Sequence, residues 1–364
     1  MTFFLIVGLT SILPGQTGTI AYITGETQET WCLSVLDVST GAVTAIGQGA
    51  RDSFPRWSPD GTRIAYQSKH PDGMGIRVAN PQAGTDEPLR HSYKWNFQPG
   101  WSPDGRKLAY SSDGDAAPLS SILVYDLDTG VETIWGGERR GLMQPVWLPT
   151  TDLMKALDPD DQMAAEALGL FALKAEAEEH GVLMAIGVTG NPPDIATEIF
   201  IVTPTLAVPL LPLLMPDSHR YVKWQVSPDN KGRQIAFESN DGGDRELFVL
   251  GRKGITNVSN HPAADWNPKW SSDNEWMAFE SFRDGRRGVY RVLASTANVF
   301  SVATGKNFDC WSPDWSPDGD YIVYVSGQTG TPQLFMARAD GSGSKQLSNG
   351  PHPALSPVWQ PKRK

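Results

Sequence analysis

The sequence is poor in cysteine, in basic charge and in long apolar runs, and each shortage excludes a class of protein. Two cysteines, Cys32 and Cys310, do not make a disulfide framework in 364 residues. The formal net charge of −10 and the pI near 5.1 oppose binding to nucleic acid phosphates and to anionic membrane surfaces. The longest Lys/Arg run is the terminal 362–364. We therefore expect no nucleic acid partner.

The longest apolar-leaning segment, residues 3–13, is too short to span a bilayer, so we expect no integral membrane span. It has the length of the apolar region of a signal peptide, but it lacks a basic segment before it and an Ala-x-Ala-like cleavage site after it. Two interpretations stay open. Residues 1–17 are either a signal peptide of a periplasmic or extracellular protein, which we favour, or a leader or strand of a cytoplasmic protein.

Catalytic and cofactor motifs are also missing from the chain. We find no G-x-S-x-G, C-x-x-C, H-E-x-x-H, P-loop or G-x-G-x-x-G sequence. The acidic loops 113–115 and 241–244 fall where a repeated unit needs a turn, so we interpret them as turns and not as calcium loops. The sequence therefore favours a protein that is not an enzyme and that needs no cofactor.

What the chain has in excess is tryptophan, glycine and proline, with 13, 36 and 28 copies. Many of them belong to a repeat whose clearest copy reads Pro-x-Trp-Ser-Pro-Asp-Gly. Its marker residues are spaced by 44, 46, 79, 44, 45 and 44 residues: Trp57, Trp101, Trp147, Val226 in the place of Trp, Trp270, Trp315 and Trp359. This is the period of a four-stranded propeller blade. We therefore predict an all-β, seven-bladed β-propeller, with six blades as the alternative.

Each unit has the pattern of consecutive antiparallel strands. Ser-Pro-Asp-Gly predicts a tight turn after the marker, because Pro presets φ and Gly accepts positive φ. An apolar second strand follows at once, as in 64–68, 108–112 and 277–281. Residues 18–47 supply three strands without a marker strand, whereas 357–359 are a marker strand with nothing after it. We predict that the two ends form one blade and close the ring.

The long interval between Trp147 and Val226 contains one insertion. Residues 158–181 read as a helix, because Asp158 can cap it, Pro159 suits its first position and Gly181 ends it. We place the insertion at about 153–181, between the first and second strands of its blade and on the face opposite the connectors. The prediction is then one propeller domain over 18–364.

These units resemble the TolB-like propeller repeats, also called PD40 or WD40-like repeats. The segments PRWSPDGTRIAYQS, PGWSPDGRKLAYSS and PDWSPDGDYIVYVS carry the resemblance, which extends over residues 18–361. Similar repeats occur in periplasmic TolB, in propeller domains attached to prolyl-oligopeptidase-type hydrolases and in a lyase family that acts on pectin fragments. The resemblance implies the fold and not one activity. TolB itself carries a further α/β domain before a six-bladed ring, and this pattern is not seen here.

The repeated tryptophans are expected to be core residues wedged between blades. The candidate binding residues lie just before the markers, in the connectors that enter the innermost strands and crowd one mouth of the central channel. They are Arg51, Asp52, Trp95, Asn96, Arg140, Arg220, Tyr221, Asp265, Trp266, Asp309 and Trp311. Arg220, Tyr221, Trp266 and Trp311 are predicted to be the energetic centre, because Trp, Tyr and Arg dominate binding hot spots.

Histidines also gather in these connectors, at His91, His219, His261 and His352. Imidazoles that converge on one mouth can hold a divalent metal, and the resembling lyases use a His-rich metal site. Two functions therefore stay open. The first, which the sequence favours, is a monomeric, exported, non-enzymatic module that binds a protein or glycan of the cell envelope. The alternative is a metal-dependent carbohydrate lyase or hydrolase.

Overall fold

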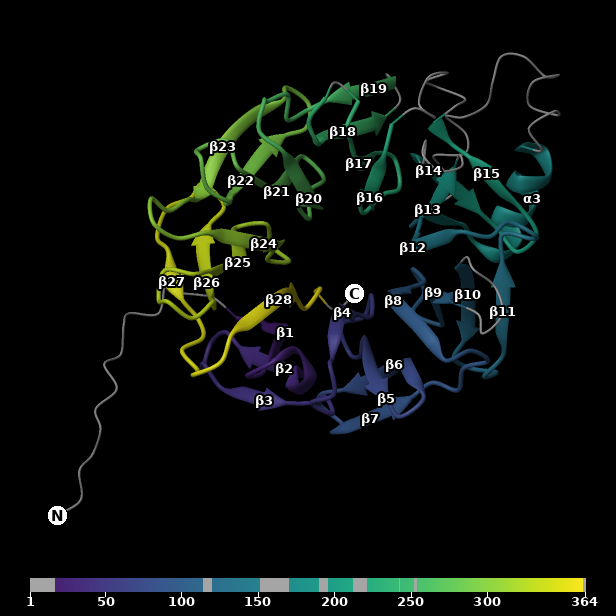
Figure 1. The fold of residues 1–364 in the computed structure, drawn as a ribbon, viewed down its shortest axis with the longest axis horizontal. Coiled ribbons are helices and arrows are strands. Elements are labelled where there is room, and N and C mark those ends of the chain that lie inside the picture. The colour runs from purple at the N-terminus through teal and green to yellow at the C-terminus, as the bar shows by residue number, and fades with distance from the viewer. Residues whose placement is uncertain are drawn as a thin grey trace.

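Antiparallel sheets follow one another around a central axis in the computed structural model, and this is the predicted β-propeller (Figure 1). The structure describes residues 17–113, 120–150, 170–189, 196–211, 221–241, 243–251 and 254–362. In each unit the chain runs from the innermost strand outward, so that successive strands are hydrogen-bonded neighbours. The all-β propeller predicted from the sequence is confirmed.

The first sheet joins the two ends of the chain and is followed by a double unit. The first sheet has the order β28 (Ala354–Trp359), β1 (Thr19–Thr24), β2 (Cys32–Asp37) and β3 (Val43–Ala45), with the short 3-10 helix η1 (Gln28–Thr30) between β1 and β2. The double unit comprises β4 (Ser53–Trp57), β5 (Ile64–His70), β6 (Gly73–Asn80), β7 (Thr85–Pro88), β8 (Trp95–Trp101), β9 (Lys107–Asp113), β10 (Ser121–Asp126) and β11 (Glu132–Trp135).

Four further sheets complete the ring, each with four strands in sequence order. The first two are β12 (Leu142–Trp147), β13 (Leu183–Thr189), β14 (Ala196–Val202) and β15 (Ala207–Pro209), then β16 (Lys223–Pro228), β17 (Ile235–Ser239), β18 (Glu246–Gly251) and β19 (Gly254–Asn257). The last two are β20 (Asp265–Trp270), β21 (Trp276–Ser281), β22 (Gly288–Leu293) and β23 (Asn298–Ala303), then β24 (Cys310–Trp315), β25 (Tyr321–Ser326), β26 (Gln333–Arg338) and β27 (Lys345–Gln346).

The double unit is one eight-stranded sheet by hydrogen bonding. Its two antiparallel halves, β4–β7 and β8–β11, are joined where Met74 of β6 pairs in parallel with Trp95 of β8. The number of blades therefore stays a prediction, because this sheet counts as one or as two. Neighbouring innermost strands contact one another around the ring, and β28 contacts both β24 and β4.

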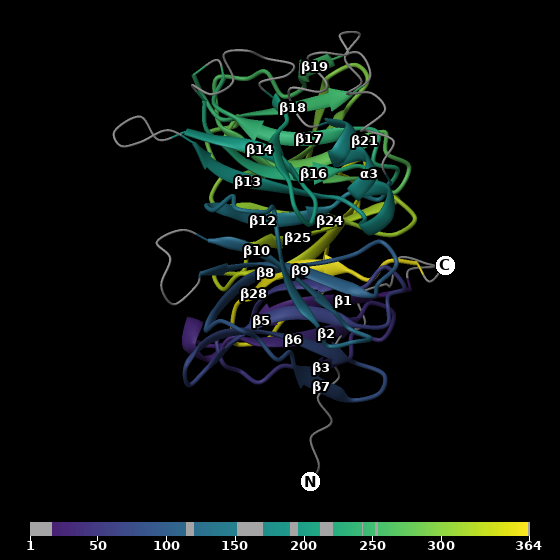
Figure 2. The same cartoon turned by 90° about the vertical axis from the view of Figure 1, so that its right-hand side faces the viewer.

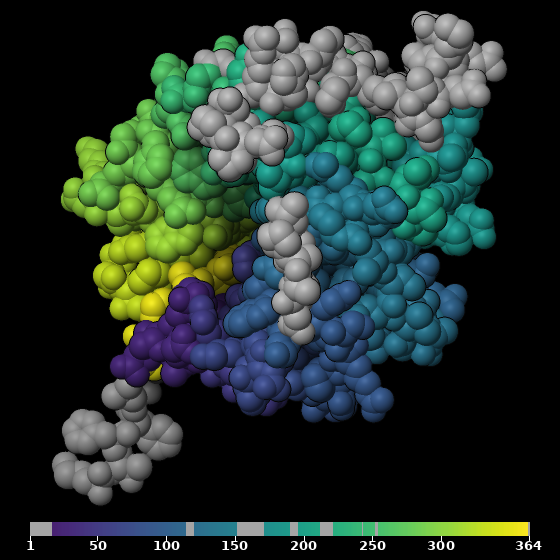
Figure 3. Space-filling model, turned by 45° about the vertical axis from the view of Figure 1, so that its right-hand side comes forward, coloured from purple at the N-terminus to yellow at the C-terminus, as the bar shows by residue number. Residues whose placement is uncertain are grey.

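The closure predicted from the two incomplete ends is present in the first sheet. Strand β28 pairs antiparallel with β1, with Trp359 opposite Ile20 and Ala354 opposite Thr24. In the space-filling view the yellow C-terminal residues lie directly beside the purple N-terminal ones (Figure 3). The N-terminal and C-terminal segments thus share one sheet, and a cluster of buried residues from β1, β2, β25, β26 and β28 lies beneath this contact.

The Ser-Pro-Asp-Gly turn works through its serine, aspartate and glycine. The Ser58 Oγ donates a hydrogen bond to Asp60 and accepts one from the Arg63 N–H at 2.9 Å, while Gly61 has a φ of 68°. The Gly61 N–H also donates to the Ser58 carbonyl. The side chains therefore satisfy the turn's own backbone groups and fix the hairpin that follows each marker.

The marker tryptophans are buried between neighbouring units, as the sequence predicts. Trp101 and Trp315 are 8% and 6% exposed. Each donates its Nε1 hydrogen to a carbonyl of the preceding innermost strand, Trp101 to Arg56 at 2.9 Å and Trp315 to Lys269 at 2.9 Å. Trp57 and Trp270 make the equivalent bonds to Val358 and Ser227. One side chain therefore supplies both apolar contact and a hydrogen bond between units.

One marker was placed wrongly from the sequence. Strand pairing sets Pro228 opposite Ile235, as Trp270 is set opposite Met277, so Pro228 and not Val226 occupies the marker position. The sequence VSPDN imitates the Ser-Pro-Asp-Gly turn, but the actual turn runs over 229–232, because Gly232 supplies the positive φ of 61°. The correction moves Trp224 to the position four before the marker.

The insertion contains the helix α3 (Leu170–His180), between β12 and β13 as predicted; residues 153–169 of the predicted insertion lie outside the described residues. Glu176 of α3 accepts a hydrogen bond from the Thr205 N–H of the β14–β15 turn at 3.0 Å. In side view α3 lies toward the same face of the propeller as the C-terminus (Figure 2). Within the described residues, no helix has the length and apolar character needed to span a membrane.

Candidate functional site

A β-bulge shapes the entrance of each innermost strand, and the candidate site is built on these bulges. The residue three before the marker has positive φ in most units, and it is followed by proline: Phe54, Gln98, Gln144, Asn267, Ser312 and Ser356. The pairing with the second strand is interrupted at this point. The bulged N–H turns away from its own sheet and is free to bond a neighbour.

The neighbour's second strand supplies the acceptor for the bulged N–H. The Gln98 N–H donates to the Gln67 side chain at 3.1 Å, and the Gln144 N–H donates to the Ser111 hydroxyl at 2.9 Å. In the C-terminal units the acceptors are carboxylates, Glu238 for Asn267 at 2.6 Å and Glu280 for Ser312 at 3.0 Å. These bonds stitch each innermost strand to the preceding sheet.

The two glutamates also hold arginines on one face of the ring. Arg245 and Arg287, each seven residues after its glutamate, donate to the second carboxylate oxygen of Glu238 and Glu280. Both carboxylates are buried, and both arginines are about one-third exposed. Burial raises the pKa of Glu238, and the charge and hydrogen bonds of Arg245 oppose this effect. The ion pairs thus anchor the inner end of each arginine and leave its outer part at the surface.

Three tryptophans lie against these arginines. The Arg245 guanidinium is 4.4 Å from the ring centre of Trp224, and that of Arg287 is 5.5 Å from both Trp266 and Trp311. All three tryptophans occupy the position four before the marker, on the successive innermost strands β16, β20 and β24. Cation–aromatic contacts join Trp224 to Arg245 and join Arg287 to Trp266 and Trp311. Asn267 links the two groups, because it donates hydrogen bonds to both Glu238 and Glu280. We call these five residues the aromatic mouth.

The aromatic mouth opens on the face that carries the connectors. The Phe282 N–H, in the β21–β22 turn, donates to the Ala264 carbonyl of the connector that enters β20. The Phe282 ring packs 5.3 Å from Trp266 and is 46% exposed. Turns between second and third strands therefore lie beside the connectors, and both border the mouth. Trp266 and Trp311, which were predicted as binding residues from the sequence, lie in this region, whereas Trp224, Arg245 and Arg287 were not predicted.

Three of the predicted binding residues are buried beneath the connectors. Asp52 accepts hydrogen bonds from the Leu33 N–H and the Ser68 hydroxyl, and Asp265 accepts one from Arg283. Asn96 donates to the carbonyls of Met74 and Tyr93. All three are 0% exposed. They hold the connectors in place, and because they are fully buried they are not available to a ligand.

The remaining predicted residues are spread around the same face. Trp95 is 47% exposed, Arg51 lies 3.5 Å from Glu29, and Asp309 lies 3.2 Å from Arg286. Arg140 donates to the carbonyls of Gly137 and Arg139. Tyr221 is partly buried beside Lys223, and Arg220 lies outside the described residues. Among the described residues, no hydrogen bond, ion pair or ring contact joins these side chains to the tryptophans and arginines of the aromatic mouth.

The imidazoles of His91 and His261 serve local structure. His91 is buried, accepts a hydrogen bond from the Ile76 N–H and contacts Tyr110 and Glu132. His261 accepts the Ala263 N–H, and the His352 carbonyl accepts from Gln333. His219 lies outside the described residues. Within the described ranges no group of three His, Cys, Asp or Glu side chains is placed to hold a metal.

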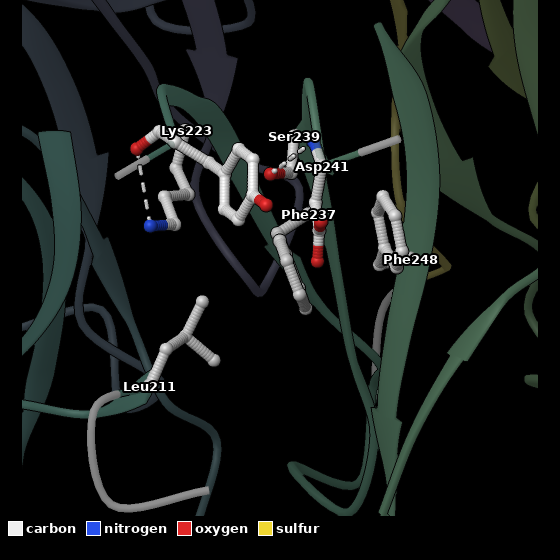
Figure 4. Close-up of a pocket in the computed structure, with 7 residues that line it drawn as sticks. Leu211, Lys223, Phe237, Ser239, Asp241 and Phe248 are labelled. Carbon is white, nitrogen blue, oxygen red and sulfur yellow. Dashed lines mark hydrogen bonds between the residues drawn. The ribbon is translucent and has the colours of Figure 1, made fainter. Parts of the chain in front are cut away.

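A small pocket between two sheets is too narrow to hold a ligand. Leu211, Lys223, Phe237 and Phe248 line it, with a cavity volume of about 10 Å³, and they point toward one another (Figure 4). Lys223 is buried, and its ammonium donates to Glu198 at 3.3 Å and to the Tyr221 carbonyl at 3.1 Å. Burial lowers the pKa of Lys223, and Glu198 opposes that shift. This pair fastens β16 to β14.

The central channel contains a much larger cavity of about 650 Å³. Its walls come from the innermost strands, mainly from the three residues before each marker and from the marker itself. The lining includes three charged residues, Arg56, Lys269 and Asp314, and the amides Gln98, Gln144, Gln225 and Asn267. This volume falls in the range of small-molecule sites. The molecule thus has two candidate sites, the aromatic mouth and this central cavity.

Known proteins similar to this chain share its propeller fold. Residues 223–364 match the family model described as the TolB beta propeller domain. This part of the chain is similar to the TolB-like propeller repeats. The resemblance predicted from the repeated segments is therefore confirmed. No curated protein matches the sequence.

Solved structures extend the likeness of the TolB-like propeller over the whole chain. TolB from Acinetobacter baumannii is 18% identical, with a TM-score of 0.58, and the match covers 97% of this chain and 69% of that one. The propeller domain of the trilobed protease from Pyrococcus furiosus is 14% identical, with a TM-score of 0.65 over 92% and 96%. An oligogalacturonate lyase in complex with manganese is 14% identical, with a TM-score of 0.58 over 88% and 85%. At these identities the likeness shows the fold alone.

Proposed function

We propose that this TolB-like propeller is a non-enzymatic binding module whose partner, a protein or glycan of the cell envelope, docks on the aromatic mouth. The observation that carries the proposal is the array of Trp224, Trp266 and Trp311 with Arg245 and Arg287. Partly exposed tryptophan and arginine side chains are the types that contribute most to binding. Rings and guanidiniums held in fixed positions lose little entropy when a partner binds.

The cost of building the array supports a functional role. A neutral acceptor such as Gln67 or Ser111 satisfies the bulged N–H equally well. Burying Glu238 and Glu280 instead has a desolvation cost that their arginines must offset, so such pairs are weak contributors to stability. What the carboxylates add is the fixed position of Arg245 and Arg287 beside the tryptophans.

The location in the envelope is also proposed and rests on the TolB-like family, whose namesake is periplasmic. The alternative, a metal-dependent carbohydrate lyase or hydrolase, shares its fold with the oligogalacturonate lyase. It needs convergent metal ligands, and the imidazoles of His91 and His261 each serve a different local contact. No contact among the described residues favours this alternative.

A site-specific crosslinking experiment tests the proposal. The photoreactive residue p-benzoylphenylalanine replaces Phe282, which borders the mouth, or Phe300 as the matched control. Phe300 is equally exposed, at 47%, and packs against Trp276 and Arg291 in the same sheet. After irradiation in cells or envelope extract, we expect an adduct of defined mass from position 282 and none from position 300. The same adduct at both positions, or none at 282, contradicts the proposal.

A further inference from the structure

Charged side chains inside the central cavity occupy one repeat position. Arg56 of β4, Lys269 of β20 and Asp314 of β24 each directly precede the marker. The other units have uncharged residues there, Gly100, Val146, Ser227 and Val358. Two cations and one anion give the described lining residues a net charge of +1, in a protein whose formal charge is −10. The cavity is therefore a positive site inside an acidic molecule.

The protein neutralises these cations only in part. Asp314 accepts the Trp359 N–H at 2.7 Å, and Arg56 donates to the Pro55 carbonyl at 3.0 Å. Among the described residues, Arg56 and Lys269 form no ion pair with any carboxylate, Asp314 included. Burial and the charge of Arg56 lower the pKa of Lys269 to about 8, although Asp314 opposes the shift. Unpaired charges in a confined space are costly, and an anion would relieve that cost.

Neutral hydrogen-bonding groups line the same cavity. The side-chain amides of Gln98 and Gln144 face it from β8 and β12, and no protein partner for either amide occurs in the described part of the chain. Their backbone N–H groups are used in the stitching bonds, so the amides remain available to a solute. Each amide offers two donors and an acceptor. The cavity thus combines cations from β4 and β20 with amides from β8 and β12.

We propose that the central cavity binds a small organic oxyanion, a carboxylate or phosphate ester that also carries hydroxyl groups. Arg56 and Lys269 bind the anionic group, and Gln98 and Gln144 bind the hydroxyls. Charge-assisted hydrogen bonds to carboxylate and phosphate are about twice as strong as neutral ones, so the anionic group decides the selection. A volume of about 650 Å³ accommodates a molecule of the size of a hexose derivative.

Isothermal titration calorimetry with matched probes tests the proposal. Glucose 6-phosphate and gluconate carry the two anionic groups, and glucose is the neutral control. We expect one of the anions to bind with a Kd below about 1 mM, whereas glucose does not bind. Lys269→Met and Arg56→Met are each expected to weaken this binding about tenfold. Asp314→Asn is expected to strengthen it, because the variant loses a competing charge while its amide oxygen still accepts the Trp359 N–H.

Three controls keep the result interpretable. Lys94→Met removes an exposed cation on the connector face and should leave anion binding unchanged. Lys269→Arg keeps the charge and should retain most of the binding; if Lys269→Met does not fold, Lys269→Gln replaces it. Circular dichroism verifies the fold of each variant. The proposal is wrong if neither anion binds up to about 10 mM, if glucose binds equally well, or if folded Lys269 and Arg56 variants bind like the wild type.

Discussion

Two regions of the ring provide different acceptors for the bulged N–H groups of the innermost strands. In β4–β11 the acceptors are the neutral side chains of Gln67 and Ser111, which bind the bulged N–H groups of Gln98 and Gln144 in the next innermost strands. In β16–β25 the equivalent acceptors are Glu238 and Glu280. Both arrangements connect neighbouring sheets, so the scaffold does not need a charge. The charged version adds two arginines and packs them on three tryptophans.

Residues that recur in both regions have a structural role, whereas residues confined to one region are candidates for binding. The marker tryptophans and turn serines recur in both regions, and their role is structural. The glutamate and arginine pairs occur in one region, where the carboxylates are buried and the arginines are partly exposed. We infer that the lopsided distribution of charge and aromatic rings, and not the repeat itself, specifies the binding face. The two regions are therefore expected to respond alike to scaffold mutations and differently to acceptor mutations.

Removing residues 355–364 should have the largest effect and should affect both regions. This deletion takes most of β28, which contacts β24 on one side and β4 on the other, and it exposes the edge of β1. Loss of the buried Trp359 and its neighbours should lower the free energy of unfolding by about 5 kcal/mol or more. Guanidinium unfolding of the truncated chain measures the loss. Unfolding at the wild-type denaturant concentration would mean that closure is not needed.

Replacing a marker tryptophan should cost the same in each region. Trp101→Ala in the neutral region and Trp315→Ala in the charged region each remove a buried indole and its hydrogen bond. We expect each to lower the free energy of unfolding by about 3–5 kcal/mol, without a specific effect on binding. Chemical denaturation gives both values. A difference of more than about 2 kcal/mol between them would show that the units are not equivalent.

Exchanging the acceptors should have a different effect on stability in each region. Gln67→Glu places a buried carboxylate on β5 without an arginine pair, and it should cost about 2–4 kcal/mol of unfolding free energy. Glu280→Gln keeps an acceptor for the Ser312 N–H and should cost less than about 1.5 kcal/mol, but it releases Arg287 from the mouth. Equal costs for the two exchanges, measured by urea unfolding, would remove the basis of the comparison.

The central cavity gives the smallest predicted effect, one that depends on pH. The pKa of Lys269 is lowered to about 8, so the folded protein releases its proton before the unfolded chain does as pH rises. The charge on Lys269 therefore destabilises the fold below pH 8, and the penalty fades between pH 8 and about 10.4. Lys269→Met should be more stable than the wild type at pH 7, by about 1 kcal/mol, and this gain should shrink toward pH 10. A constant gain across thermal melts at several pH values would contradict this.

The sequence predicts the scaffold well because the scaffold repeats. The spacing of the markers, the turn chemistry and the two incomplete ends indicate the propeller and its closure, which Ile20 and Trp359 confirm by pairing. The single register error arose at Val226, because two overlapping turn sequences lie within 227–232 and only the folded chain selects Gly232 as the residue with positive φ. A repeat with a degenerate marker thus remains ambiguous by two residues.

The candidate site is less predictable because its residues come from different parts of the unit. Connector position alone does not distinguish Asp265, which is buried, from Trp266 next to it. Arg245 and Arg287 lie in the turn after the second strand, outside the connectors. A usable signal exists, since Phe-Glu-Ser occurs in both units with an arginine seven residues after the glutamate. Lys269 and Arg56 occupy the variable position of the Pro-x-Trp repeat, and nothing in the sequence indicates that this position faces a cavity.

The most direct test of the aromatic mouth uses the partner identified by crosslinking at position 282. Calorimetry compares the affinity of the wild type, of Trp266→Ala and Trp311→Ala, and of Trp276→Ala, whose ring lies in the Phe300 and Arg291 cluster. We predict that each mouth variant stays folded and binds more weakly by about 1–4 kcal/mol, whereas Trp276→Ala binds like the wild type. Unchanged affinity in both folded mouth variants would contradict the account and place the binding site elsewhere on the ring.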